Sequence, residues 1–128
     1  MKILIVDDCQ TTRKLLSLYL KSKGYAVATA ENGLDALEKL GTDTINLVLT
    51  DLNMPYMDGL ELIKNIKTNP DLQELPVIMV TTEADPEERE KAMKAGASAY
   101  MIKPVTADKV SENILLILKQ MFGKGGAD

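Results

Sequence analysis

Five short aliphatic runs recur along this chain, and each is followed by a segment in which apolar residues return with a helical period. The runs are ILIV (3–6), AVATA (26–30), NLVLT (46–50), VIMVT (77–81) and AYMI (99–102). They lack the apolar–polar alternation of a half-exposed antiparallel strand. The first, third and fourth are apolar nearly throughout, which is typical of central strands covered on both faces.

The segments between these runs predict helices that cover a sheet. Apolar stripes mark four of them: Leu15, Leu16, Tyr19 and Leu20 in 12–23; Leu34, Leu37 and Leu40 in 32–40; Leu60, Ile63 and Ile66 in 59–67; and Val110, Ile114, Ile117, Leu118 and Met121 in 106–121. The fifth begins at DPEERE (85–90), with an aspartate cap and a proline at the first helical position, and ends at Gly96. Strand and helix alternate without a linker, which predicts one doubly wound α/β domain with five parallel strands and helices on both faces.

Composition narrows the function classes. Fifteen basic and 19 acidic residues give a net charge of −4, which disfavours nucleic acid and an anionic membrane surface as partners. The apolar runs are too short to span a bilayer, and the Met-Lys start leads directly into a strand, so no secretory segment is expected. A single cysteine, Cys9, fits a reducing compartment, and the absence of histidine excludes an imidazole base. We expect a soluble cytoplasmic protein with a domain at 1–122 and a flexible tail at 123–128.

Charged and hydroxyl side chains follow four of the five predicted strands. Asp7 and Asp8 come after the first strand and Asp51 after the third, Thr81 ends the fourth, and Lys103 follows the fifth. In open α/β sheets, ligands bind outside the carboxyl ends of the strands. These side chains are therefore expected to gather at one edge of the sheet and form a site.

Three carboxylates facing one ammonium repel one another. Like charges a few ångströms apart cost several kcal/mol at an effective dielectric constant of about 20, and a dication relieves that repulsion. Mg²⁺ prefers carboxylate oxygens and retains several waters. Asp8 and Asp51 are the first expected ligands, with Asp7 bound directly or through water and the Asn53 carbonyl completing the set. Such a site suits a phosphoryl group, for which the Asp51 carboxylate is a competent nucleophile.

Five motifs in this order resemble response regulator receiver domains, especially the chemotaxis CheY type. They are the DD pair, D-x-N-M-P-x-M-D-G (51–59), V-T-T-E (80–83), A-G-A-S-A-Y (95–100) and K-P (103–104). The resemblance covers residues 2 to about 121. It implies the flavodoxin-like strand order 2-1-3-4-5.

The resemblance also implies a role for each matched residue. Asp51 accepts a phosphoryl group from a phosphohistidine on a partner kinase, with Mg²⁺ held by Asp7, Asp8, Asp51 and Asn53. Lys103 bridges Asp51 to the phosphoryl oxygens, and the bond to Pro104 is cis. Thr81 and Tyr100 then switch the surface formed by the fourth helix, fifth strand and fifth helix, where a downstream protein binds. Asn53 and Glu83 tune dephosphorylation. The chain is thus expected to be a stand-alone signalling switch, catalysing only its own phosphorylation and dephosphorylation.

Three departures from the family pattern are visible in the sequence. Thr82 stands where a small alanine is common and is expected to crowd the path of Tyr100. Val105 replaces the aromatic residue often found after K-P. The acidic EADPEERE segment (83–90) differs from the more basic start of this helix in flagellar-type members. This last difference argues against a flagellar-motor output, whereas the phosphorylation site is intact.

Other interpretations remain open beside this one. An aspartyl-nucleophile phosphohydrolase usually has a second carboxylate two residues after the nucleophile, where this chain has Asn53. A flavodoxin-type cofactor binder cradles phosphate in the loop after the first strand, and two aspartates there would repel it. A degenerate receiver would act only through protein contacts, although every site residue is present here.

Several residues carry a structural reading as well as a functional one. Asp7 also reads as a cap of the first helix, and Cys9 as a small buried or helix-entry residue. Tyr100 is equally well explained as a half-buried tyrosine. Leu116 and Phe122 fall off the main stripe of the last helix, which fits either a wide core face or a docking or dimer surface. Whether the chain pairs with itself stays open.

Overall fold

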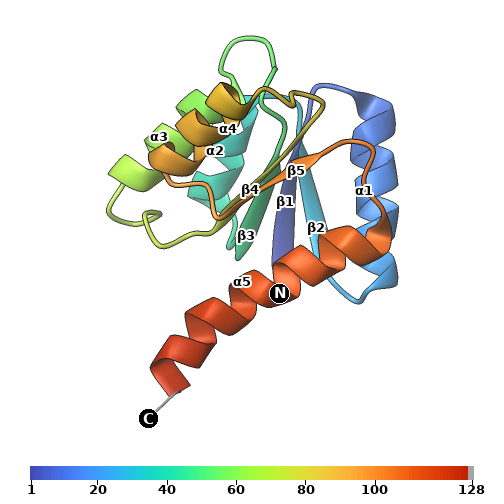
Figure 1. The fold of residues 1–128 in the computed structure, drawn as a ribbon, viewed down its shortest axis with the longest axis vertical. Coiled ribbons are helices and arrows are strands. Elements are labelled where there is room, and N and C mark those ends of the chain that lie inside the picture. Colours follow the sequence, from blue (N-terminus) through green and yellow to red (C-terminus); the bar gives the residue numbers. More distant parts are fainter. Residues whose placement is uncertain (127–128) are drawn as a thin grey trace.

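The computed structural model describes the backbone of residues 1–126 and the side chains of residues 1–121. Within them a single parallel sheet has the strand order β2-β1-β3-β4-β5, as the resemblance implied (Figure 1). Its strands are β1 Lys2–Val6, β2 Ala26–Ala30, β3 Leu47–Thr50, β4 Val77–Thr81 and β5 Ala99–Ile102. The central strands β1, β3 and β4 are almost completely buried, which explains why their sequences are apolar nearly throughout.

A helix follows each strand, with bounds close to those predicted from the sequence. The helices are α1 Gln10–Ser22, α2 Gly33–Thr42, α3 Gly59–Thr68, α4 Pro86–Ala95 and α5 Ala107–Gly126. The side chains of Asn32, Asp58 and Asp85 cap α2, α3 and α4 by accepting a backbone N–H from the first turn. Gly96 ends α4 with a left-handed φ of 117°, a conformation that favours glycine.

The end of α5 bears on the predicted tail at 123–128. The helix continues to Gly126, so residues 123–126 belong to it, and residues 127–128 lie outside the described part of the chain. Among the described residues, no helix is both long and apolar enough to cross a membrane.

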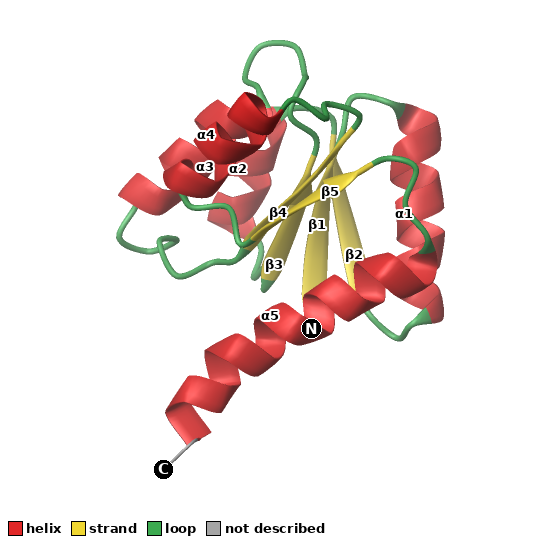
Figure 2. Cartoon of the chain, in the orientation of Figure 1, coloured by secondary structure: helices red, strands yellow, loops and turns green. Residues whose placement is uncertain are grey.

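The sheet separates two layers of helices, as the doubly wound prediction requires (Figure 2). Helices α2, α3 and α4 pack on one face against Leu4, Val48 and Met79. Helices α1 and α5 pack on the other face against the alternate strand residues Ile3, Ile5, Leu47, Leu49, Ile78 and Val80. Helices therefore cover both faces of the sheet. The polar side chains that follow the strands collect at the carboxyl ends of the strands, which the helices leave open.

Three members of the predicted apolar stripes are exposed: Leu15 in α1, Leu34 in α2 and Met121 in α5. Each lies at the margin of its stripe, where the helix buries a narrower face against the sheet than the periodicity predicts. Leu115 and Leu116 are exposed as well, so α5 presents apolar side chains that its own core face does not need. The Phe122 side chain, which the sequence associates with that surface, lies outside the described residues.

Candidate phosphoryl-acceptor and metal site

Parallel register brings four strand ends to the same edge of the sheet. Val6 pairs with Thr50, Thr50 with Met79, and Thr81 with Ile102. Asp7 and Asp51 each follow directly after one of these paired strands, and Lys103 follows β5. The side chains expected from the sequence to meet at this edge, which is the upper edge in Figure 1, therefore start from neighbouring backbone positions.

The three predicted carboxylates meet. Asp7, Asp8 and Asp51 each offer an oxygen within 4.8 Å of the others, a spacing suited to a shared metal ion. Their burial differs: Asp7 is 2 % exposed, the Asp51 side chain is 13 % exposed, and Asp8 is open to solvent. Such a set of carboxylates suits Mg²⁺, because this ion prefers oxygen ligands and keeps several waters, for which the exposed side of the cluster at Asp8 leaves room. Asn53 is exposed, two residues after Asp51 on the same loop.

Lys103 is the cation of the site. Its Nζ lies 2.7 Å from Asp7 Oδ2 and 3.2 Å from Asp51 Oδ2, so it bridges two of the three carboxylates. Burial lowers the pKa of Lys103, but the hydrogen bond to Asp7 and the charges of Asp51 and Asp7 outweigh it and raise the pKa above the ordinary lysine value. The ammonium therefore stays charged at physiological pH. The Lys103–Pro104 peptide is cis, as the resemblance implied.

Asp7 also organises the start of α1. Its Oδ1 accepts the backbone N–H of Cys9 at 2.9 Å, and its carbonyl oxygen accepts Arg13 Nη1 at 2.6 Å. No side chain caps α1, whose N-cap is Cys9, so the prediction that Asp7 caps this helix is wrong; Asp7 instead accepts the backbone N–H of the N-cap residue. Cys9 is the exposed N-cap residue of α1, which agrees with a helix-entry role and not with a buried one. The contact of Arg13 is not predictable from the sequence, because an arginine on an amphipathic helix gives no signal that it will bond to the end of a strand.

A hydrogen bond and the close approach of Gly59 surround Asp51. Asp51 Oδ1 accepts the backbone N–H of Leu52 at 2.7 Å, and a Cβ added to Gly59 would lie 2.2 Å from the Asp51 carbonyl oxygen. Only a residue without a Cβ therefore fits at the first position of α3, against the backbone of the predicted acceptor Asp51. The sequence shows the glycine of the M-D-G motif, but it does not show that this glycine lies against the Asp51 carbonyl oxygen. Met54 and Met57 pack against the core beneath this loop.

Thr81 and Tyr100 are linked through one residue. Thr81 is fully buried, and its Oγ1 accepts the backbone N–H of Glu83 at 3.2 Å. The Tyr100 hydroxyl donates to the carbonyl oxygen of Glu83 at 2.7 Å. Tyr100 is half-buried, and this burial, reinforced by carboxylates including Glu83 and Glu88, raises the pKa of its phenol. Two hydrogen bonds to a single residue thus connect the threonine at the site to a side chain beside α4. Thr82 is exposed.

Comparison with known proteins identifies the family. Residues 3–115 match the family model of the response regulator receiver domain. The chain belongs to the response regulator receiver family. It is 40 % identical over 122 residues to chemotaxis protein CheY-3 of Vibrio cholerae, covering 94 % of both chains. It is 41 % identical over 120 residues to chemotaxis protein CheY1 of Helicobacter pylori, covering 92 % of this chain and 97 % of that one.

Solved structures agree with this receiver assignment. A CheY-like receiver domain protein from Methanospirillum hungatei superposes with a TM-score of 0.89 at 32 % identity, covering 96 % of this chain and 97 % of that one. CheY4 of Vibrio cholerae gives a TM-score of 0.81 at 33 % identity, covering 93 % and 96 %. Receiver domains of this type are signalling switches that interact with histidine kinases and downstream targets, and the acidic cluster described above is one that could hold a metal.

Proposed function

We propose that this chain is a response regulator receiver in which Mg²⁺-dependent phosphoryl transfer from a partner histidine kinase to Asp51 switches the α4–β5–α5 surface. The observation that carries the proposal is the bridge from Lys103 to both Asp7 and Asp51 within a three-carboxylate cluster. A turn aspartate alone would need none of these neighbours. Charge neutralisation and positioning are what phosphoryl transfer mainly requires.

The donor set fits the metal. Asp7, Asp8 and Asp51 would hold Mg²⁺, with the Asn53 carbonyl as a further oxygen ligand on the same loop. When bound, the ion neutralises negative charge on the transferring phosphoryl oxygens. Lys103 already neutralises part of the cluster from its buried side, which leaves the more exposed Asp8 side open to the ion and to an incoming donor.

In the transfer step, a carboxylate oxygen of Asp51 forms a bond to phosphorus as the bond from phosphorus to the donor's imidazole nitrogen breaks. The leaving imidazole keeps the bonding electron pair and takes a proton. Lys103 holds the Asp51 carboxylate in place and offers its ammonium to the phosphoryl oxygens. The Thr81 oxygen already accepts from Glu83 N–H, so its own O–H remains to donate to the phosphoryl group. The donor is a phosphohistidine on another protein, because this chain has no histidine.

The signal passes from Thr81 to Tyr100 through Glu83. When Thr81 moves toward the phosphoryl group it weakens the bond from Glu83 N–H, and the Glu83 carbonyl that Tyr100 holds shifts with it. Tyr100 then turns from its half-buried position into the interior and remodels the α4–β5–α5 surface, where the downstream protein binds. Asn53 and Glu83, at the rim of the site, set the rate of dephosphorylation. Phosphorylation thereby biases an existing two-state equilibrium.

The acidic net charge and the single exposed cysteine fit a cytoplasmic protein whose partners are proteins and not nucleic acid or membrane. Pairing with a second copy after phosphorylation is a further state that the exposed leucines of α5 would accommodate. A general phosphohydrolase is less well supported, because Asn53 occupies the place of its acid. A receiver that acts only by protein binding would have no use for the buried Lys103 bridge.

Phosphorylation of purified protein tests the proposal. Incubation with Mg²⁺ and a small phosphodonor is expected to give a labile mass gain of one phosphoryl group, lost in Asp51→Asn and on chelation of the metal. Asp58→Asn is the matched control, since Asp58 caps α3 in the same loop and lies outside the cluster. Mass gain in Asp51→Asn, or multiple turnover of phosphomonoesters, would contradict the proposal.

A further inference from the structure

A side chain of α1 binds the peptide group that joins Asp7 to Asp8. The carbonyl oxygen of this group, which belongs to Asp7, accepts Arg13 Nη1 at 2.6 Å, a short hydrogen bond from a charged donor. Arg13 is the fourth residue of α1, and its side chain is only 14 % exposed. The phosphoryl-transfer steps proposed above give this contact no role.

The hydrogen-bond ladder between β1 and β2 ends just before this carbonyl group. Val6 and Ala30 are the last paired residues of the two strands. The N–H of Asp7 still donates to the Ala30 carbonyl oxygen at 3.1 Å, but Asp7 itself lies one residue beyond β1. A backbone carbonyl of a buried residue needs a hydrogen-bond partner, and Arg13 supplies it here.

The position of this peptide group matters because it carries two of the three carboxylates of the acidic cluster. A peptide group is planar, so fixing its oxygen restricts the orientation of both Cα atoms that it joins. Asp7 has further contacts, since its Oδ1 accepts the Cys9 N–H and its Oδ2 accepts the Lys103 ammonium. Asp8 is exposed, so its backbone is what orients its side chain. Arg13 therefore acts on the placement of the two carboxylates relative to each other.

The other polar contact of Arg13 is weaker. Its Nη2 lies 3.9 Å from Glu31 Oε1, and the Glu31 side chain is 74 % exposed. An exposed ion pair of this length contributes little to stability. The planar guanidinium presents several N–H donors in a fixed fork, so Nη1 stays on the Asp7 carbonyl oxygen while Nη2 faces Glu31. The bond to the Asp7 carbonyl is thus the main polar contact of Arg13.

We propose that Arg13 is a positioning residue of the metal site, which holds the Asp7–Asp8 peptide in the orientation that lets both carboxylates bind Mg²⁺. This role rests on the proposed binding of Mg²⁺ at the acidic cluster. Its expected effect has the opposite sign to that of simple electrostatics. A guanidinium near the cluster repels a dication, so loss of its charge alone would strengthen Mg²⁺ binding. Loss of the fixed peptide instead weakens binding, because the ion must then order the loop.

Titration of the backbone amide chemical shifts with Mg²⁺, on the unphosphorylated protein at constant ionic strength, measures the dissociation constant. Arg13→Met keeps an apolar stem without a donor and is expected to raise this constant by roughly tenfold, as loss of a group that orients metal ligands does. Arg13→Lys keeps the charge and one donor, and its constant should lie between those of wild type and Arg13→Met.

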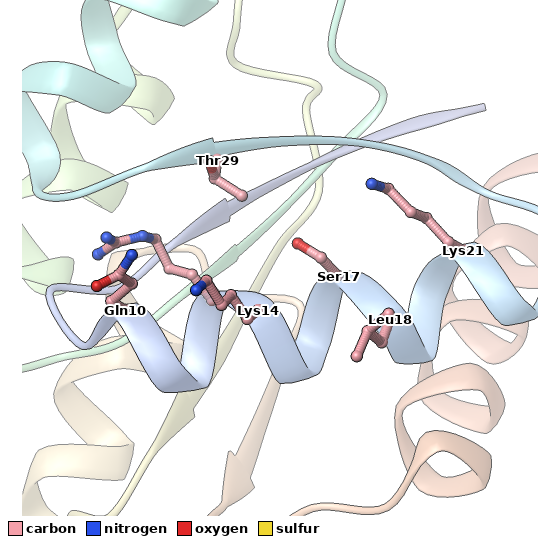
Figure 3. A pocket seen from close by; sticks show the side chains of 7 residues that line it. Gln10, Lys14, Ser17, Leu18, Lys21 and Thr29 are labelled. Carbon is pink, nitrogen blue, oxygen red and sulfur yellow. The ribbon is translucent and has the colours of Figure 1, made fainter.

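Lys14→Met is the matched control for charge. It removes the same charge from the next residue of α1, which is exposed and lines a groove of about 470 Å³ between α1 and β2. Figure 3 shows Lys14 in this groove, with Thr29 on β2. This variant should bind Mg²⁺ within about twofold of wild type, because solvent and salt screen an exposed charge. Glu31→Gln, which removes only the weaker partner of Arg13, should also bind Mg²⁺ as wild type does.

Hydrogen exchange in the metal-free protein gives a second readout. The Cys9 amide, which donates to Asp7 Oδ1, should exchange faster in Arg13→Met than in Lys14→Met. Unchanged or tighter Mg²⁺ binding by Arg13→Met, or an equal loss in Lys14→Met, would overturn the positioning role and leave the metal site in place. If the wild-type protein itself does not bind Mg²⁺ at the cluster, the proposed function fails, and the role of Arg13 fails with it.

Discussion

At the scale of single residues, one partly buried ammonium balances part of the negative charge of the acidic cluster. Lys103 contacts both Asp7 and Asp51, and Asp7 is nearly inaccessible to water. A buried carboxylate without a partner is costly, so the lysine has a structural role in the metal-free protein besides the role toward phosphate that is proposed above. Stability and chemistry therefore depend on the same contact.

Replacing Lys103 by methionine should expose this structural role. In metal-free buffer, Lys103→Met is expected to lower the free energy of unfolding by about 1–3 kcal/mol, because Asp7 loses its ammonium while remaining buried. Urea denaturation measures the change. Lys91→Met is the matched control, since the Lys91–Glu88 pair is exposed and should cost less than about 1 kcal/mol. Equal effects of the two substitutions would contradict a supporting role for Lys103.

The phenol of Tyr100 should ionise at a higher pH than that of an ordinary tyrosine. Burial and the surrounding carboxylates favour its neutral phenol, so its pKa in the folded protein lies above the ordinary value of 10.0. Subtracting the alkaline ultraviolet titration of Tyr100→Phe from that of wild type should isolate a transition with its midpoint above that value. The neutral phenol of Tyr100 therefore contributes to the free energy of unfolding. This contribution is fully present below pH 10 and is lost as pH rises through the pKa of the folded state, because the phenol ionises first in the unfolded chain. A midpoint at or below 10 would argue against the half-buried, hydrogen-bonded position.

At the scale of elements, the loop between β3 and α3 shows what sequence patterns predict and what they omit. The strand, the Asp58 cap and the start of α3 follow from apolar runs and cap chemistry. The close approach of Gly59 to the Asp51 carbonyl does not, because it depends on where α3 lies in three dimensions. Tyr56, with a left-handed φ of 69°, is equally invisible in the sequence. Local signals place elements along the chain but not their mutual contacts.

An alanine in place of Gly59 should therefore disturb the acceptor directly. Its Cβ would approach the Asp51 carbonyl oxygen and the Leu52 Cα, which are backbone atoms with little freedom to move. We expect a loss of about 1–3 kcal/mol in unfolding free energy and slower phosphorylation at Asp51. Gly41→Ala in α2, where an added Cβ meets nothing within 4 Å, should instead be neutral or stabilising by about 0.5–1 kcal/mol. Similar behaviour of the two alanine variants would show that the predicted clash is absorbed.

At the scale of the whole molecule, the alternating strand–helix order was enough to predict a single sheet with helices on both faces, and the end of the sheet at which the polar residues meet. That prediction succeeded because parallel strands with right-handed crossovers leave few arrangements. The exposed positions of Leu15 and Leu34 were not predictable, because burial at a stripe's margin depends on how neighbouring helices cover it. The Arg13 contact to the Asp7 carbonyl joins a helix to a strand end and has no local signature either.

A global consequence of the acidic cluster is that Mg²⁺ should stabilise the fold. In the proposed function the ion binds the folded arrangement of Asp7, Asp8 and Asp51, which the unfolded chain does not maintain, so the free energy of unfolding is expected to rise with free Mg²⁺. Once its concentration exceeds the dissociation constant, each tenfold increase should add about 1.4 kcal/mol. Urea denaturation at constant ionic strength measures this slope and removes the contribution of charge screening.

The Asp8→Asn variant distinguishes Mg²⁺ binding at the acidic cluster from a general relief of repulsion among the carboxylates of the protein. Asp8 is exposed and Lys103 does not contact it, so the substitution should leave the metal-free fold intact. It removes one carboxylate ligand, and the onset of stabilisation should move to a higher Mg²⁺ concentration by roughly tenfold or more. Asp71→Asn, at an exposed aspartate after α3, is the control and should follow the wild-type curve. If Asp8→Asn and Asp71→Asn respond to Mg²⁺ alike, the cluster does not retain the ion, and metal-dependent phosphorylation of Asp51 loses its physical basis.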